Sequence, residues 1–287
     1  MKKSRKQTNG IQIITRIMVI ILILLCIALA AVIFFKLKDT DKSVSDEVPG
    51  AADSEQTSAA DPVHTLAVQD MAIGTVVDKA QIDMTRLDQY FVANEIGEDV
   101  FQFINGRSFV ENENISREQL RYLKVLHYNF NHEVQVGEII VNAGIAEDVR
   151  NIFRELFEQE YEIASMSLIE NFWTGDGVSS DKNSIENNNT SAFNYRTIAG
   201  TDQLSNHALG YAIDVNPLQN PYVAYNADGS FREVYRDMER YIDRANGEAH
   251  MISHEDVCYQ IFTKYGFTWG GDWTDPIDYQ HFEKNPG

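Results

Sequence analysis

Two short motifs in the C-terminal half of the chain carry the residue types of a catalytic metal site. The first is SNHALGYAID, from Ser205 to Asp214, and the second is DYQH, from Asp278 to His281. Two imidazoles and one carboxylate would bind Zn²⁺ and leave its fourth tetrahedral position open for water. A second carboxylate nearby could accept the proton of that water. The motifs therefore predict a metal-dependent hydrolase.

We expect the three ligands to be His207, Asp214 and His281. Apolar and polar residues alternate from Tyr211 to Val215 as in a strand, which places Asp214 on the face opposite the apolar side chains. The preceding turn, with Gly210, lets His207 fold back toward Asp214. Each residue alone is ordinary on a protein surface. The occurrence of His207 and Asp214 in one short motif, together with a histidine near the C-terminus, predicts a metal site.

Several carboxylates near His281 compete for the role of general base. Asp278 lies three residues before His281, so a regular strand would point the two side chains in opposite directions and a bend is required. Asp275 and Glu283 are rivals. Glu283 shares a strand face with His281 and could instead orient its imidazole through the second ring nitrogen. We rank Asp278 first as base and Glu283 second.

Three further residues have two open roles each. Ser205 could hydrogen-bond a substrate carboxylate or stabilise the turn that carries His207, and we favour the turn. Trp269 and Trp273 lie in the loop region before the second motif and could line a substrate groove or close the core.

At these motifs the sequence resembles the M15 family of zinc D,D-carboxypeptidases and L-alanyl–D-glutamate endopeptidases. The family pattern is S-x-H-x-x-G-x-A-x-D, followed later by an acidic residue, two spacers and His. The segments NNTSAFNYR (188–196) and NPLQNPY (216–222) resemble its membrane-anchored bacterial branch. The resemblance is close over residues 120–287 and weaker over 66–119.

The resemblance implies roles for individual residues. His207, Asp214 and His281 would bind zinc, Asp278 would be the general base, and Arg196 would stabilise the developing oxyanion. Many carboxypeptidase members have Glu at the base position, whereas the Asp found here is similar to the endopeptidase branch. The implied substrate is the stem peptide of peptidoglycan.

The N-terminal residues predict a membrane anchor. A basic tail, residues 1–16, precedes an uncharged apolar run, residues 17–35, which is long enough to cross a bilayer as a helix. Basic residues on this flank favour a cytoplasmic N-terminus and an extracytoplasmic remainder. A cleaved signal peptide, with Ala28-Leu29-Ala30 as the cleavage site, is the alternative. Residues 36–65 are rich in small polar residues and predict a disordered linker, which leaves 66–287 as the peptidase region.

The net charge and the cysteine content further limit the possible partners and the location of the protein. The formal net charge is −19, and no basic stripe interrupts the acidic part, so we expect no nucleic-acid partner. Cys258 is the one cysteine after the apolar run, which excludes a disulfide within the exported part and suggests a small buried side chain on a helix. An anchored, exported protein of this kind fits the outer face of a Gram-positive cell membrane.

The remaining patterns predict an α+β fold, with a small, mostly antiparallel sheet and flanking helices like that of Hedgehog domains and D,D-peptidases. Apolar spacing from Val149 to Phe157 predicts a helix, and a second helix is expected from Ser253–Asp256 to Gly266. Strands are expected at 133–141 and 166–172. The polar stretch 174–189 shows no apolar periodicity and is predicted to be a loop.

These inferences favour a membrane-tethered zinc peptidase that acts on cell-wall stem peptides. Two alternatives belong to other classes: a zinc-bearing binding module without catalysis, and a scaffold that docks proteins at the cell wall. Both Asp278 and Arg196 are present, which argues against loss of catalysis. Which stem-peptide bond is cut, and which protein partners exist, are left open by the sequence.

Overall fold

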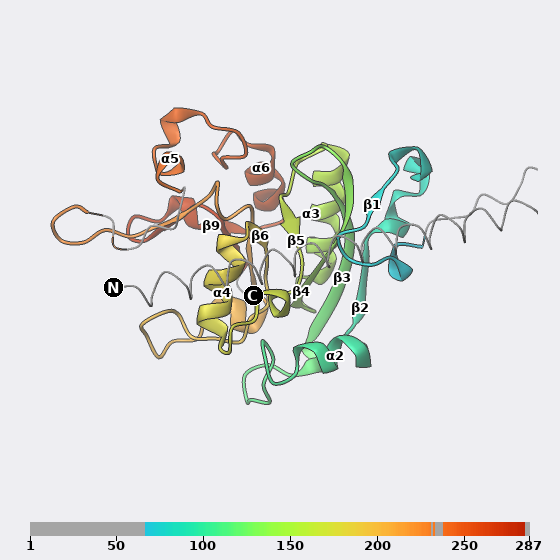
Figure 1. Ribbon diagram of the computed structural model, residues 1–287, viewed down its shortest axis with the longest axis horizontal. Helices are drawn as coiled ribbons and strands as arrows, with labels where there is room; N and C mark the ends of the chain where they lie inside the picture. The colour runs from blue at the N-terminus through green and yellow to red at the C-terminus, as the bar shows by residue number, and fades with distance from the viewer. Residues whose placement is uncertain (1–66, 231, 233–237, 285–287) are drawn as a thin grey trace, which may run out of the picture. The chain divides into compact units, whose positions relative to one another are not determined.

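The computed structural model describes residues 67–230, 232 and 238–284, and these belong to one compact unit spanning His64–Gly287 (Figure 1). The predicted cytoplasmic tail, membrane anchor and linker, residues 1–65, lie outside the described residues. Among the residues that are described, no helix is long and apolar enough to cross a membrane. The membrane anchor therefore stays a prediction.

The largest sheet is built on a long hairpin of β3 (Leu120–Tyr128) and β4 (Val134–Asn142). Short strands β1 (Val76–Val77) and β2 (Val92–Glu95) complete the antiparallel order β1-β4-β3-β2. Nearly every residue of β4 is buried, including the polar Glu138 and Asn142. The strand predicted at 133–141 is confirmed.

Helix α3 (Ala146–Glu158) lies against this sheet and contacts β3 (Figure 1). The apolar positions that predicted the helix are all buried: Val149, Ile152, Phe153, Leu156 and Phe157. Helix α6 (Val257–Lys264) contacts α3. It begins after Asp256, whose side chain accepts a hydrogen bond from the backbone N–H of Cys258, and the chain turns at Gly266 with φ +82°. Both helix predictions are confirmed, and Cys258 is fully buried.

A second antiparallel sheet has the order β7-β11-β9, with β7 (Ala212–Asp214), β11 (His281–Glu283) and β9 (Thr268–Trp269). Its core face is held by Phe282, which stacks on Phe262 of α6 with ring centroids 4.2 Å apart. Two smaller pairs complete the set: β8 (Tyr222–Val223) runs antiparallel to β10 (Ile277–Asp278), and β5 (Ser165–Met166) runs parallel to β6 (Asn189–Thr190).

The mixed fold with mainly antiparallel pairing is confirmed, but the expectation of one small sheet is wrong. The strands that carry the C-terminal motifs are only two or three residues long and are separated by turns. Such short strands pair locally instead of extending the β3–β4 hairpin. The shorter helices are α2 (Glu98–Ile104), α4 (Gly177–Glu186) and α5 (Glu239–Ile242).

Two local predictions are wrong. The expected strand 166–172 ends at Met166 and continues as a 3-10 helix, Ile169–Phe172, because consecutive residues there are buried and no alternation survives. The expected polar loop contains α4, which Asp176 caps by accepting a hydrogen bond from Ser179 N. Its buried positions are Ser180, Ser184 and Ile185, so small polar side chains form most of the inward face. Apolar periodicity does not reveal such a helix.

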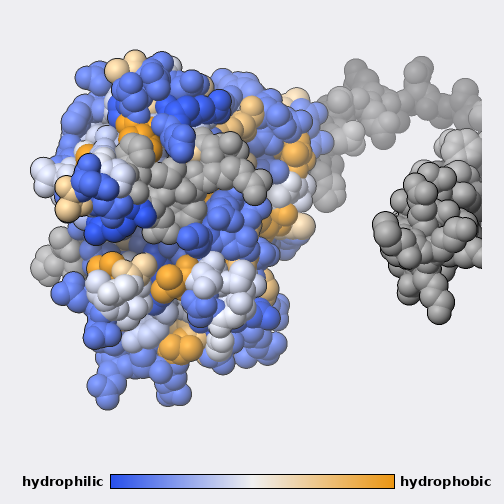
Figure 2. All heavy atoms as spheres, turned by 60° about the vertical axis from the view of Figure 1, so that its left-hand side comes forward, coloured by the Kyte–Doolittle hydropathy of each residue, from blue (hydrophilic) through white to orange (hydrophobic). Residues whose placement is uncertain are grey.

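The face of the unit drawn in Figure 2 is largely hydrophilic, and its hydrophobic residues form small, separate groups. This surface agrees with the acidic composition of the chain.

Candidate metal centre

The register of β7 and β11 places Asp214 directly opposite His281. Residues opposite each other in an antiparallel pair point to the same face of the sheet. The neighbouring pair, Ile213 and Phe282, is fully buried on the core face. One face of this short sheet therefore anchors the core, while the other presents two of the three predicted ligands side by side.

His207 reaches the same place from a turn. It lies in a 3-10 helix, Asn206–Leu209, and Ser205 Oγ accepts a hydrogen bond from its backbone N–H at 3.3 Å. The turn ends at Gly210 with φ +72°, and a Cβ there would lie 2.6 Å from the backbone nitrogen of Asn142. Glycine is required both for the left-handed conformation and for this close approach. The contact of Ser205 fits the turn role that we favoured.

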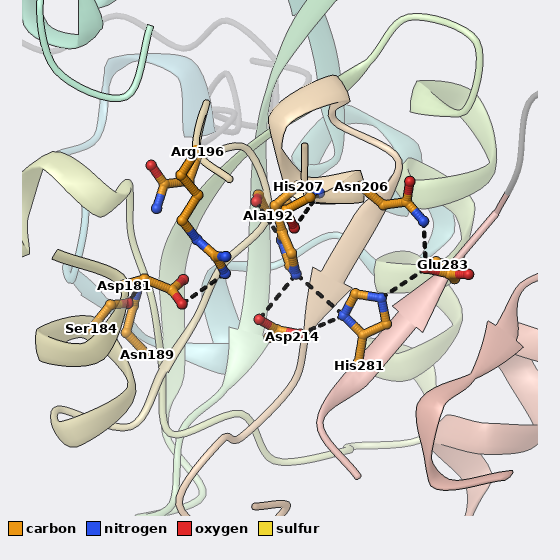
Figure 3. A network of polar contacts seen from close by, with 12 residues as sticks. Asp181, Ser184, Asn189, Ala192, Arg196, Asn206, His207, Asp214, His281 and Glu283 are labelled. Atoms are coloured by element: carbon orange, nitrogen blue, oxygen red, sulfur yellow. Dashed lines mark hydrogen bonds and ion pairs between the residues drawn. The ribbon is translucent and has the colours of Figure 1, made fainter. Parts of the chain in front are cut away.

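The structure brings the three predicted ligands together in a buried cluster (Figure 3). Nε2 of His207 is 3.2 Å from Oδ2 of Asp214, and Nδ1 of His281 is 3.1 Å from Oδ1 of the same carboxylate. The two imidazole nitrogens are themselves 3.2 Å apart. These three residues could hold a metal ion, because one ligand atom from each lies within 4.8 Å of the others.

In each imidazole, the ring nitrogen that points away from Asp214 has a hydrogen-bond acceptor. Nδ1 of His207 is 2.7 Å from the carbonyl oxygen of Ala192, and Nε2 of His281 is 3.0 Å from Oε2 of Glu283. An acceptor at one ring nitrogen holds the proton there and leaves the lone pair of the other nitrogen free. The other nitrogen of each ring faces the carboxylate of Asp214, an arrangement that fits a bound cation.

Neighbouring segments position these two acceptors. The segment after β6 pairs with β7, where Asp214 N donates to Ser191 O at 2.9 Å, and this pairing directs the Ala192 carbonyl toward His207. Asn206 Nδ2 donates to Glu283 Oε2. Sequence reasoning proposed the contact of Glu283 with His281 but missed Ala192 and Asn206. A backbone carbonyl leaves no residue-type signal, and an asparagine beside a motif is not distinctive.

The charges in the cluster stabilise one another. Burial alone would raise the pKa of Asp214, but the imidazoles of His207 and His281 hold it well below its usual range. Burial would lower the pKa of His281, yet contacts with Asp214 and Glu283 raise it to about 10. The proton that this favours on Nδ1 of His281 is the one that a metal ion would displace.

Asp278 occupies β10 and reaches the cluster through a bend. The turn Tyr279–Gln280 separates it from His281, as the spacing required. Its side chain is buried, and its Oδ1 has no hydrogen-bond partner among the described residues. Burial, followed by the negative charge of Asp214, raises the pKa of Asp278 to about 7. This carboxylate is therefore able to take up a proton near neutral pH.

Residues 199–284 match the family model described as D-alanyl-D-alanine carboxypeptidase, of the M15 peptidases. The resemblance to M15 peptidases noted in the sequence is therefore confirmed over this segment. The match covers less than half of the chain, and it includes the three clustered residues and Asp278. Arg196 and Ala192 lie before the matched residues. No curated protein and no solved structure shows significant similarity to the chain.

A cleft of about 680 Å³ opens over the M15 motifs. Ile185, Ile198 and Leu204 contribute apolar side chains to its lining, which also includes Trp273. The ring of Trp273 is 5.2 Å from that of His281 between centroids, and the residue is 37% exposed. Trp269 is instead 4% exposed and donates through Nε1 to Tyr279 O. Of the two candidate tryptophans, Trp273 lines the cleft and Trp269 closes the core.

Arg196 also lines the cleft and is largely buried, with a side chain 13% exposed. Its Nη2 donates to Oδ2 of Asp181, on α4, at 2.7 Å (Figure 3). Burial opposes its charge, but the carboxylates of Asp181, Asp214 and Asp278 raise the pKa of Arg196 above its usual value. The guanidinium is therefore a permanent cation beside the M15 motifs. Asp181 was not identified from the sequence, because it lies in the stretch predicted to be a loop.

Proposed function

We propose that this protein is a zinc-dependent peptidase that hydrolyses an amide bond in the stem peptide of peptidoglycan. The observation that carries the proposal is the buried convergence of His207, Asp214 and His281, with each remote imidazole nitrogen held by an acceptor. The M15 family match supports a peptidase acting on a substrate related to peptidoglycan.

Zinc is the metal that this donor set favours. Two imidazole nitrogens and one carboxylate form a common three-residue set of catalytic zinc sites, and both histidines have the supporting contacts typical of them. A zinc ion bound there would supply Lewis-acid chemistry for hydrolysis of an amide.

The surrounding residues divide the remaining work. Asp278 accepts a proton at Oδ1 from the attacking water and returns it to the nitrogen of the leaving amine, so that no net proton is consumed. Arg196 donates N–H hydrogen bonds to the scissile carbonyl oxygen as its negative charge develops. Glu283 keeps the imidazole of His281 in place.

Two bonds of the stem peptide fit the proposal. The description of the family model favours removal of a terminal D-alanine. The Asp at the base position, Asp278, resembles instead the branch that cuts between L-Ala and D-Glu. Each of these bonds has an alanine on at least one side, and the lining of Ile185, Ile198 and Leu204 is compatible with an alanine methyl group.

The proposed location is the outer face of the cell membrane. Residues 17–35 would anchor the chain with the N-terminus in the cytoplasm, and residues 36–65 would tether the peptidase near the wall. The sequence alone supports this part of the proposal.

The decisive experiment incubates the full-length, zinc-loaded protein in detergent with defined muropeptides and identifies the products by mass spectrometry. Loss of a terminal alanine identifies a carboxypeptidase, and separation of L-Ala from D-Glu identifies an endopeptidase. A protein that binds zinc but cleaves none of the muropeptides would favour the alternative of a binding module or scaffold without catalysis.

A further inference from the structure

Helix α4 is seated tightly against the segment that carries Arg196. A Cβ at Gly177, the first residue of α4, would lie 2.9 Å from Oδ1 of Asn194 and 3.0 Å from Cβ of Arg196. Asn194 Nδ2 also donates to Gly177 O at 2.9 Å. The glycine and the amide together fix how the helix start meets this segment.

Asp181 follows Gly177 by four residues, so the two lie on the same face of α4. The helix thereby directs the Asp181 carboxylate to Arg196, with 2.7 Å between Oδ2 and Nη2. Both side chains are largely buried, at 16% and 13% exposed. Within the described part of the chain, Asp181 is the carboxylate that forms an ion pair with this guanidinium.

Arg196 has other negative groups in reach of its charge. Asp214 and Asp278 both act electrostatically on the guanidinium, and both line the same cleft. An arginine has several rotatable bonds, so one without an anchor would be free to turn toward these carboxylates. The short contact with Asp181 opposes that movement, because it holds Nη2, whereas Nη1 makes only a longer contact of 3.4 Å with the carbonyl oxygen of Thr197.

We propose that Asp181 is a positioning residue, which holds the guanidinium of Arg196 at the distance and angle needed to stabilise the oxyanion. The inference rests on the proposed function. It adds a residue of α4, outside the segment matched by the family model, to the machinery of the cleft.

The test compares two variants at this position with a matched control. Asp181→Asn keeps the shape but removes the charge, and Asp181→Glu restores the charge on a longer side chain. Glu186→Gln removes an equal charge from an exposed position of the same helix. Each protein is measured for zinc content, melting temperature, kcat and KM on a muropeptide, and affinity for a phosphinate dipeptide analogue that carries a tetrahedral anionic centre.

We expect Asp181→Asn to retain zinc and to lose about 10- to 100-fold in kcat, the usual range for a supporting contact, with a smaller change in KM. Its affinity for the phosphinate should fall by the same factor as kcat/KM, because both report binding of the tetrahedral anion. Asp181→Glu should recover part of both losses. Glu186→Gln should match the unmodified protein.

Four outcomes would overturn the inference. Asp181→Asn could behave like Glu186→Gln, or it could lose zinc or thermal stability in proportion to activity, which would indicate a structural role. A change in KM alone would place Asp181 in substrate binding instead. If the unmodified protein cleaves no muropeptide, the proposed function is wrong. Phosphinate binding then tests Asp181 separately. If the unmodified protein and Asp181→Asn bind the phosphinate equally, or if neither binds it, the positioning role of Asp181 is rejected as well.

Discussion

Asp214 and His281 face each other across the β7–β11 pair, and Oδ1 of Asp214 lies 3.1 Å from Nδ1 of His281. The pairing register decides this contact. A slip of one residue would bring Phe282 opposite Asp214 and turn His281 toward the core. The buried pair of Ile213 and Phe282 opposes such a slip, so apolar packing on one face determines the geometry of the polar site on the other.

Metal content tests the three-residue site. The purified protein should bind about one zinc per chain, and His207→Ala or His281→Ala should weaken binding sharply, because each removes one of three protein donors. Elemental analysis after dialysis measures the ratio. His254→Ala is the control, since this histidine is exposed and contacts Asp272. Stoichiometric zinc in a His207→Ala, His281→Ala double variant would show that the metal binds elsewhere.

The two carboxylates near His281 can be distinguished by amide substitution. Asp278→Asn should retain zinc while turnover falls by roughly 10²–10⁴, the usual effect of losing a general base. Glu283→Gln should cost about 10- to 100-fold, because it weakens a contact that orients an imidazole. Steady-state kinetics with zinc content measured in parallel separates the two effects. If Asp278→Asn stays active and Glu283→Gln does not, their roles must be exchanged.

Gly270 controls the approach of the loop before β10 to the site. A Cβ at this position would lie 2.6 Å from Asp278 O and 3.2 Å from Cβ of His281. Gly270→Ala should therefore displace both residues and lower kcat by at least about 10-fold, since an ångström of misplacement can cost 10²-fold. Gly97→Ala is the control, because no atom lies within 4 Å of its added Cβ. Equal activity of the two variants would contradict the prediction.

Stability should fall in acid because of His127. This side chain is 2% exposed, and burial lowers its pKa to about 4, below about 6.5 in an unfolded chain. The unfolded state therefore binds the proton more tightly. The contribution of His127 is complete above pH about 6.5 and declines by about 1.4 kcal/mol per pH unit until the pH reaches the folded pKa.

His127→Gln removes this titration. Urea unfolding at several pH values between 7.5 and 4.5 should show a smaller loss of stability for the variant than for the parent protein. The absolute stability of the variant is not decisive, because the histidine packs closely against Gly137. Identical slopes against pH would exclude His127 as the source of the acid sensitivity.

Protease treatment of intact cells tests the predicted topology. The basic tail and the uncharged run 17–35 predict that external protease removes the peptidase region while a tag on the N-terminus stays protected. Immunoblots of both ends measure the result, and lysed cells provide the control. Soluble protein that begins near Ala31 would support the alternative of a cleaved signal peptide.

The candidate site was largely accessible from residue types and short spacings. His207 and Asp214 are separated by one turn and one strand, and Asp278 and His281 by one bend, so local geometry constrains each pair. The helices α3 and α6 were predicted for a similar reason, because apolar side chains repeat along one face.

Other features depended on contacts between distant segments. The carbonyl of Ala192 and the carboxylate of Asp181 support the site only because β6 and α4 fold beside β7 and Arg196. Helix α4 was missed because serines, not aliphatic residues, form most of its buried face. The sequence likewise left Trp269 and Trp273 equivalent, and burial separated them. Residue type and local spacing determine which side chains can do chemistry. The hydrogen-bond partners, burial and orientation of those side chains arise only when segments distant in the sequence pack together and remove them from water.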